Sequence, residues 1–120
     1  MLSGCAIHPG APPAGEDRSG RVAEYARRFE GVPYRWGGDS SSGMDCSGLV
    51  HRVFQDVCGL SLPHSSQAIY REARKIPLRA LSPGDLLFFC ENRGGPVSHI
   101  GIYLGEGSFI HASTHGVRIS

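Results

Sequence analysis

The sequence predicts an α+β domain in which helices come first along the chain and an antiparallel sheet follows. Between Arg21 and Gly59, apolar residues recur every three or four positions, the spacing that places them on one face of a helix. From Leu81 onward, short apolar runs and an alternation of apolar with polar residues replace that spacing, as in strands. The chain has 120 residues, 17 of them glycine, which fits one modest core with short elements and tight turns.

Helices are predicted at three places in the first part of the chain. The first covers residues 21–30, where four apolar side chains share one face. The second begins at Asp45 or Cys46 and ends before Gly59, because a short acidic side chain can cap the free amides of a first turn and glycine ends helices well. A third, shorter helix is predicted over residues 65–74.

Strands are predicted over residues 86–90, 99–104, 108–112 and 117–119, joined by tight turns. The chain stops within the last of these strands. We therefore expect the domain, residues 21–120, to be truncated at its C-terminal end.

Residues 1–20 are predicted to form a flexible arm, because proline, glycine and alanine dominate the stretch and no helical or strand period survives in it. The arm carries Leu2-Ser3-Gly4-Cys5, which resembles a lipobox, the signal for cleavage before a cysteine that is then lipidated. Only Met1 precedes this motif, so the alternatives are a start further upstream or a chance match with an ordinary thiol.

Net charge argues against a nucleic-acid partner. The chain holds 12 Lys and Arg against 11 Asp and Glu, a net charge of +1, too little to bind a polyphosphate. No apolar run is long enough to span a bilayer. Membrane contact is expected only through a lipid anchor at Cys5.

Cys46, His99 and His111 form a candidate catalytic group. A helix N-terminus favours the thiolate of a cysteine, and a nucleophilic thiol needs an imidazole that a third group orients. The two histidines lie in strands joined by a tight turn, so both rings can reach the same face, on which the helix of Cys46 is expected to pack. A buried structural cysteine and a metal site made of the three residues are the alternatives; metal binding is weaker because no two ligands are close in sequence.

Three stretches resemble the NlpC family of bacterial cell-wall cysteine peptidases, whose fold is papain-like. They read PYRWGG at 33–38, GMDCSGLV at 43–50, and SHIGIYLG at 98–105 with FIHAS at 109–113, and the turn PGDL at 83–86 also agrees. The resemblance covers about residues 22–120. It is greatest to the outer-membrane lipoprotein endopeptidases of the family.

The resemblance implies a role for each matching residue. Cys46 corresponds to the nucleophile, His99 to the general base, and His111 to the residue that orients the base by accepting a hydrogen bond from its Nδ1. Tyr34 corresponds to a tyrosine beside the nucleophile that can donate to the tetrahedral intermediate together with the Cys46 amide.

The resemblance also implies a substrate and a location. Asp45 and Ser47 match positions that bind the free amine of the substrate peptide in some relatives. The substrate is expected to be a peptidoglycan stem or cross-link peptide, cut at D-Glu–diaminopimelate or D-Ala–diaminopimelate through a thioester, with no cofactor and no metal. The location is the periplasm, with an outer-membrane anchor at Cys5, and an adaptor or regulatory protease is an open possibility.

Two other functions are compatible with the sequence. The fold can serve as a wall-binding module without catalysis, or the Cys–His pair can transfer acyl groups to lipid or amine acceptors. The intact set of nucleophile, base and orienting residue favours catalysis. The polar stretch 39–42 and Asp45 favour a zwitterionic peptide over an apolar acyl group.

Overall fold

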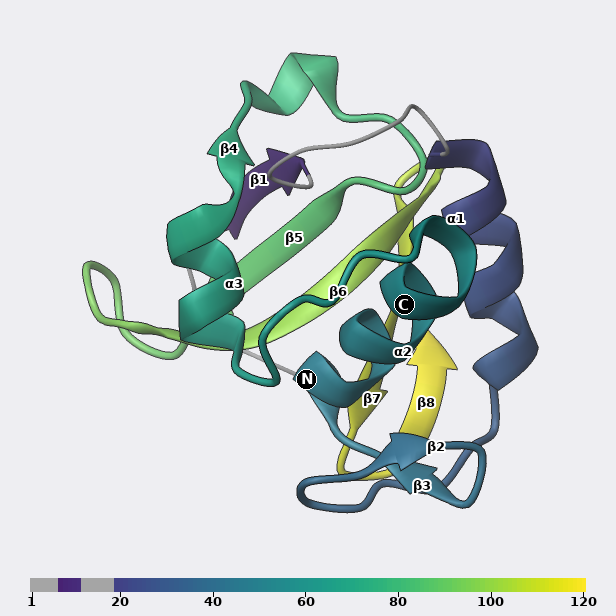
Figure 1. The fold of residues 1–120 in the computed structure, drawn as a ribbon. Coiled ribbons are helices and arrows are strands. Elements are labelled where there is room, and N and C mark those ends of the chain that lie inside the picture. The colour runs from purple at the N-terminus through teal and green to yellow at the C-terminus, as the bar shows by residue number, and fades with distance from the viewer. Residues whose placement is uncertain (1–6, 12–18) are drawn as a thin grey trace.

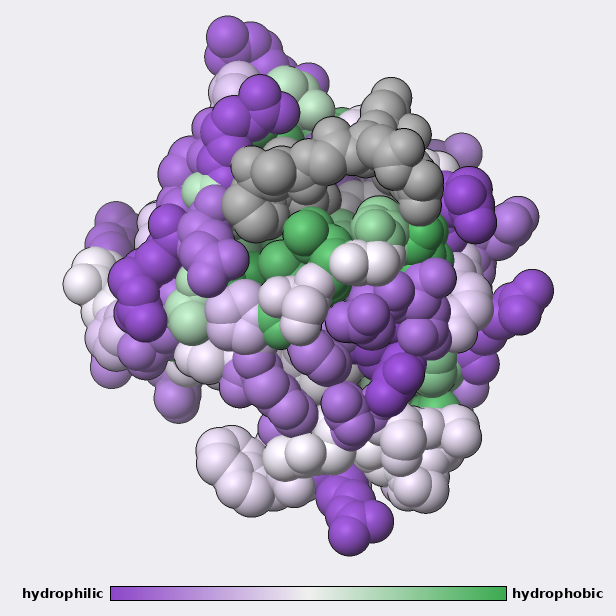
Figure 2. Space-filling model, viewed as in Figure 1, coloured by the Kyte–Doolittle hydropathy of each residue, from purple (hydrophilic) through white to green (hydrophobic). Residues whose placement is uncertain are grey.

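A computed structural model describes residues 7–11 and 19–120 of the chain. Within these residues, three α-helices cover an antiparallel sheet (Figure 1). The α+β class and the order of helices before the main strands are confirmed. The face of the molecule shown in Figure 2 is mostly hydrophilic, with hydrophobic side chains gathered over the middle of β5 and β6.

Helices form at the three predicted places, although the first ends as an α-helix at Ala26. Helix α1 covers Ser19–Ala26 and continues into a 3-10 turn, η1, at Arg27–Phe29. Helix α2 covers Cys46–Cys58, with Asp45 as its N-cap and Gly59 in the left-handed conformation as its C-cap. Helix α3 covers Ser66–Glu72, and a second 3-10 turn, η2, covers Leu78–Ala80.

The main sheet has six strands in the order β4-β1-β5-β6-β7-β8. The predicted meander is its larger part. The strands are β1 Ile7–Ala11, β4 Arg74–Lys75, β5 Leu86–Cys90, β6 Val97–Gly105, β7 Ser108–Ser113 and β8 Gly116–Ile119, all paired antiparallel. A small hairpin of β2 Asp39–Ser40 and β3 Gly43–Met44 leads into α2.

Strand β1 corrects the prediction that the whole arm is flexible. Residues 7–11 pair with β5, from Ile7 opposite Phe89 to Gly10 opposite Leu86, and with β4. The strand could not be predicted from composition, because backbone hydrogen bonds to β5 and β4 define it and its sequence has no strand periodicity. Gly10 also permits the close approach, since a Cβ there would lie 2.9 Å from the ring of Phe88. Cys5 and the rest of the lipobox-like motif lie outside the described residues.

The core lies between α2 and the sheet. Leu49, Val53 and Phe54 of α2 are fully buried against a layer that includes Ile100 and Ile102 of β6. Burial of such side chains contributes about 1.5–3 kcal/mol each. This packing fixes the first turn of α2 over the sheet.

Candidate active site

Asp45 ties the first turn of α2 to the preceding loop. Its Oδ1 accepts from the backbone N–H of Gly48 (2.8 Å), and its Oδ2 accepts from that of Gly37 (2.8 Å). The loop carbonyl of Gly38 lies against Gly48, where any Cβ would overlap with it. The sequence DCSG thus places a cap, a thiol and a contact glycine within one helical turn, and Cys46 becomes the first helical residue.

His99 and His111 form a hydrogen-bonded imidazole pair. Nε2 of His99 lies 2.8 Å from Nδ1 of His111, and Nε2 of His111 lies 2.9 Å from Oγ of Ser120. We expected Nδ1 of His99 to make this contact. That prediction is wrong, because Nε2 makes it. Nδ1 of His99 is therefore the nitrogen that the pair leaves for another partner.

The two imidazoles were predicted on the face of the sheet on which α2 packs. This prediction is wrong, because they lie on the opposite face. They alternate with the core residues of β6 and β7 and contact Phe89 and Phe109, with ring centroids 5.8 Å and 4.8 Å apart. The ladder between β6 and β7 ends at the pair Ile102–Ile110. His99 and His111 lie beyond that pair, where the two strands diverge (Figure 1).

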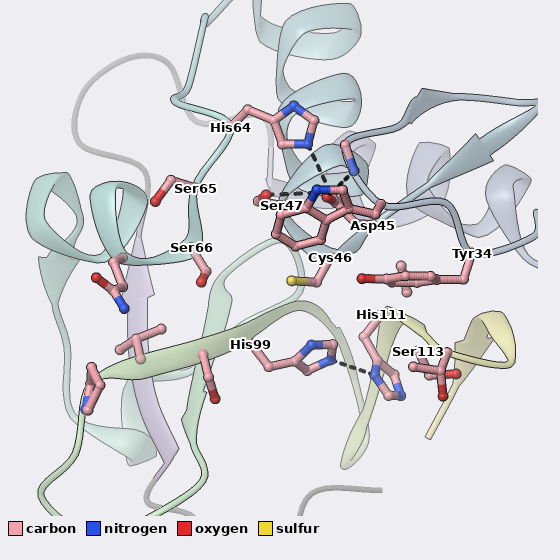
Figure 3. Close-up of a pocket in the computed structure, with 18 residues that line it drawn as sticks. Tyr34, Asp45, Cys46, Ser47, His64, Ser65, Ser66, His99, His111 and Ser113 are labelled. Atoms are coloured by element: carbon pink, nitrogen blue, oxygen red, sulfur yellow. Dashed lines mark hydrogen bonds and ion pairs between the residues drawn. The ribbon is translucent and has the colours of Figure 1, made fainter.

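Cys46, His99 and His111 nevertheless line one cleft. Figure 3 shows the sulfur of Cys46 above the ring of His99, with His111 beside that ring and the hydroxyl of Tyr34 turned toward Cys46. The amide of Ile100, at the point where β6 and β7 diverge, hydrogen-bonds to the Cys46 sulfur. Because the two strands diverge here, the N-terminus of α2 can approach the imidazole pair.

Burial favours the neutral form of both the thiol and the imidazole. Burial raises the pKa of Cys46, although the backbone amides of Ile100 and Ser47 oppose that shift. Burial, and next the neighbouring His111, lower the pKa of His99 to about 4. Burial also lowers the pKa of His111. At neutral pH these shifts favour thiol and imidazole over thiolate and imidazolium, against the thiolate that the position at the helix N-terminus predicts.

Tyr34 keeps its phenolic proton in this cleft. Burial raises the pKa of Tyr34, and the charge of Asp45, with that of the Cys46 thiolate once it forms, raises it further. A protonated hydroxyl is a hydrogen-bond donor, which is the property that a developing oxyanion needs.

The structure brings His64, which belongs to none of the motifs above, onto Asp45. Its Nε2 lies 2.8 Å from Oδ1 of Asp45. Burial raises the pKa of Asp45, but hydrogen bonds from His64, Gly37 and Gly48 outweigh burial, and the net pKa lies below its usual value. Ser47 is also buried, with its Oγ 3.5 Å from Oδ1 of Asp45. No sequence period links His64 to Asp45, so only the fold reveals the pair.

The cleft has a volume of about 760 Å³. Besides the residues above, its walls come from the start of α3, the start of β6 and the end of β7. Trp36 lies at its edge with 85% of its surface exposed. Within residues 7–11 and 19–120, no three His, Cys, Asp or Glu side chains are arranged to hold a metal ion. Nor does any helix in this part of the chain have the length and apolarity to cross a membrane.

A helix-borne thiol beside an imidazole pair on an antiparallel sheet defines a papain-like α+β domain. The chain belongs to the NlpC/P60 family, whose pattern matches residues 31–120. The expected resemblance is thereby confirmed.

Named relatives support the family assignment. The chain is 45% identical over 106 residues to the probable endopeptidase Rv2190c of Mycobacterium tuberculosis, covering 88% of this chain and 26% of the relative. It is 39% identical over 105 residues to murein DD-endopeptidase MepS/murein LD-carboxypeptidase of Escherichia coli K12, covering 87% and 55%. The chain therefore spans about a quarter of the first relative and about half of the second.

Solved structures share the fold. The NlpC/p60 domain of the peptidoglycan hydrolase SagA has a TM-score of 0.77 and 32% identity, covering 86% of this chain and 88% of that one. RipD of M. tuberculosis, described as a non-catalytic NlpC/p60 domain protein adapted to peptidoglycan binding, has a TM-score of 0.74 and 26% identity, covering 88% of both chains. The fold thus occurs in hydrolases and in a binding protein.

Proposed function

We propose that this protein is a cysteine peptidase that hydrolyses peptidoglycan stem or cross-link peptides. The observation that carries the proposal is the convergence of Cys46, His99 and His111 on one cleft, with the two imidazoles 2.8 Å apart. Relatives named as endopeptidases support the same reaction class.

The first half of the reaction forms a thioester. Nδ1 of His99 takes the proton of the Cys46 thiol as Sγ attacks the peptide carbonyl carbon. His111 accepts the hydrogen bond from Nε2 of His99 and stabilises the imidazolium that forms. The carbonyl oxygen becomes an oxyanion, which accepts hydrogen bonds from the Cys46 amide and the Tyr34 hydroxyl. The C–N bond then breaks, and His99 gives its proton to the leaving amine.

The second half regenerates the thiol. Neutral His99 takes a proton from a water molecule, whose oxygen attacks the thioester carbon. The new tetrahedral intermediate expels the Cys46 sulfur, which recovers its proton from His99. The products are a peptide carboxylate and a peptide amine, and no cofactor or metal enters either half.

The proposed scissile bond is D-Glu–diaminopimelate or D-Ala–diaminopimelate, the two bonds that the family resemblance implies. Such a substrate places the protein outside the cytoplasm, and we propose the periplasm with a lipid anchor on Cys5 at the outer membrane. Mass spectrometry of the N-terminal peptide, after expression of the gene in a Gram-negative host, tests the anchor. An unmodified Cys5 in that peptide rules it out.

The experiment on function incubates purified muropeptides, both cross-linked dimers and free tetrapeptides, with three forms of the protein. Wild type and Cys58→Ala, which removes a thiol at the other end of α2, are expected to produce new fragments. Cys46→Ala is expected to produce none. The fragment masses identify the bond.

Other outcomes separate the alternatives. Fragmentation by Cys46→Ala contradicts the mechanism. Retention of the protein on peptidoglycan sacculi without fragments from wild type supports a binding module like RipD. New products that carry an added lipid or amine acceptor instead of water support an acyltransferase.

A further inference from the structure

Both carboxylate oxygens of Asp45, which lines the cleft, already accept hydrogen bonds within the protein. Its Oδ1 accepts from His64 and Gly48, both at 2.8 Å, and its Oδ2 accepts from Gly37 at 2.8 Å. Ser47, its neighbour in the expected amine site, is 6% exposed, as is Asp45 itself. An ammonium group that approaches Asp45 from the cleft therefore competes with His64 for Oδ1.

His64 is held in this position from the other side. Its ring stacks on that of His51, with the planes 6° apart and the centroids separated by 6.0 Å. Nδ1 of His51 lies 2.6 Å from the carbonyl oxygen of Leu62, and Nε2 of His51 lies 3.8 Å from Asp39. The next residue, Ser65, caps α3 by accepting from the Ala68 amide at 3.2 Å. The imidazole is therefore part of a fixed wall rather than a loose side chain.

Hydrogen-bond donors within the protein also stabilise the negative charge of Asp45. Its lowered pKa keeps it ionised, and the backbone amides and His64 supply its hydrogen bonds. A substrate ammonium that binds at Oδ1 must displace the charge-assisted hydrogen bond of His64 before it can form its own. A substrate whose amine is acylated carries no such charge and has no need of this carboxylate.

We propose that His64 is a specificity-determining residue that closes the Asp45–Ser47 amine site. The protein then prefers stem peptides whose amino end is acylated, as in intact peptidoglycan, over peptides with a free amino end. This inference rests on the proposed peptidase function. It replaces the expectation that Asp45 and Ser47 bind a free amine.

The test compares two peptides that differ only at the amino end. They are L-Ala–γ-D-Glu–diaminopimelate–D-Ala with a free amine and the same peptide N-acetylated. Wild type is expected to cleave the acetylated peptide with a kcat/KM about tenfold or more above that of the free peptide, since one charge-assisted hydrogen bond separates them. The ratio of the two constants is unaffected by a general loss of folded protein.

Variants at position 64 then assign the preference. His64→Ala exposes the Asp45 carboxylate to the cleft. The kcat/KM of the free-amine peptide is then expected to rise, and the kcat/KM values of the two peptides to come within about threefold of each other. His64→Gln retains an N–H donor and is expected to keep most of the preference. His115→Ala, which removes an exposed histidine in the β7–β8 turn, is the matched control and is expected to leave the ratio unchanged.

Equal cleavage of the two peptides by wild type, or an unchanged ratio in His64→Ala, overturns the inference and leaves the peptidase function standing. If neither peptide is cleaved, the function is in question, and binding decides the inference by itself. Titration of each peptide into Cys46→Ala then measures the same ratio as dissociation constants. Tighter binding of the free-amine peptide overturns the inference, and tighter binding of the acetylated peptide supports it.

Discussion

Nε2 of His99 lies 2.8 Å from Nδ1 of His111, and with this contact the proposed mechanism requires one tautomer of each ring. For Nδ1 of His99 to receive the Cys46 proton, its Nε2 must carry the hydrogen and donate it to His111. Neutral His111 then holds its own hydrogen on Nε2, where Ser120 Oγ lies 2.9 Å away as the acceptor. A neutral orienting residue is consistent with the low pKa of His99, since a carboxylate in the place of His111 would raise that pKa.

The first prediction tests this orienting role of His111. His111→Ala removes the acceptor and is expected to lower kcat about a hundredfold or more, because the wrong tautomer of His99 becomes accessible. His111→Asn keeps an acceptor oxygen near the position of Nδ1 and is expected to retain activity within about tenfold of wild type. Nitrogen-15 NMR of His99 provides the second readout, with the Nε2–H tautomer populated in wild type and Asn but not in Ala. Wild-type kcat in the Ala variant contradicts the role.

The second prediction concerns the pH dependence of the rate. His99 acts as a base only when neutral, and its pKa is about 4. The value of kcat/KM is therefore expected to rise with pH through about 4 and to stay level through neutrality. The raised pKa of Cys46 predicts in addition that alkylation of this thiol by iodoacetamide accelerates only at alkaline pH. A fast alkylation rate that is already level at pH 6 indicates a thiolate–imidazolium pair instead.

The third prediction is a loss of stability in acid that comes from the same imidazole. The pKa of His99 is about 4 in the folded state and about 6.5 when the chain is unfolded. Between these values the unfolded chain binds the proton and the folded protein does not, so stability falls as pH falls from 6.5 toward 4. At pH 4.5 the lowered pKa of His99 reduces the free energy of unfolding by on the order of 2 kcal/mol relative to neutral pH. The lowered pKa of His111 acts in the same direction. Denaturant unfolding at pH 7 and pH 4.5 measures it, with His99→Gln as the variant in which the dependence is expected to shrink.

Sequence patterns predicted the parts of this domain that depend on local rules. The start of α2 at Cys46, its Asp45 cap and its Gly59 terminus follow from capping and spacing, and all three are found. Strand β1 was missed because its pairing partners lie far away in the chain. The pairing of His64 with Asp45 was missed for the same reason, since 19 residues separate the two. Alternation along β6 and β7 placed the two imidazoles together, but the divergence of the strands that admits Cys46 is a tertiary feature.

The fourth prediction tests the contact glycine of the DCSG turn. A Cβ at Gly48 would overlap with the carbonyl oxygen of Gly38, a backbone atom that cannot rotate away. Gly48→Ala is expected to push the loop off the helix, to cost about 1–3 kcal/mol and to reduce kcat, because Tyr34 lies in the loop that would move and Asp45 Oδ1 lies 2.9 Å from the added Cβ. Gly107→Ala is the control for glycine loss in general, since a Cβ there meets nothing within 4 Å and only its positive φ of 79° is strained. Equal kcat in the two variants argues against a catalytic effect of the contact.

The fifth prediction concerns Trp36, a residue that is 85% exposed at the edge of the cleft. Its loop is held by the Arg35 amide on the Met44 carbonyl (3.2 Å) and by the Gly37 amide on Asp45, so the ring is presented on a fixed backbone. An exposed aromatic ring on a fixed loop stabilises nothing in the free protein but offers a packing surface to a bound substrate.

Trp36→Ala is therefore expected to raise KM about fivefold, the equivalent of about 1 kcal/mol of aromatic packing, with kcat and the melting temperature unchanged. Leu78→Ala is the matched control, because Leu78 is 67% exposed and lies in η2, outside the cleft lining. Kinetics on the acetylated tetrapeptide measure both variants. A parallel rise of KM in the two variants shows a general surface effect, whereas a fall in kcat for Trp36→Ala alone shows that the loop itself has moved.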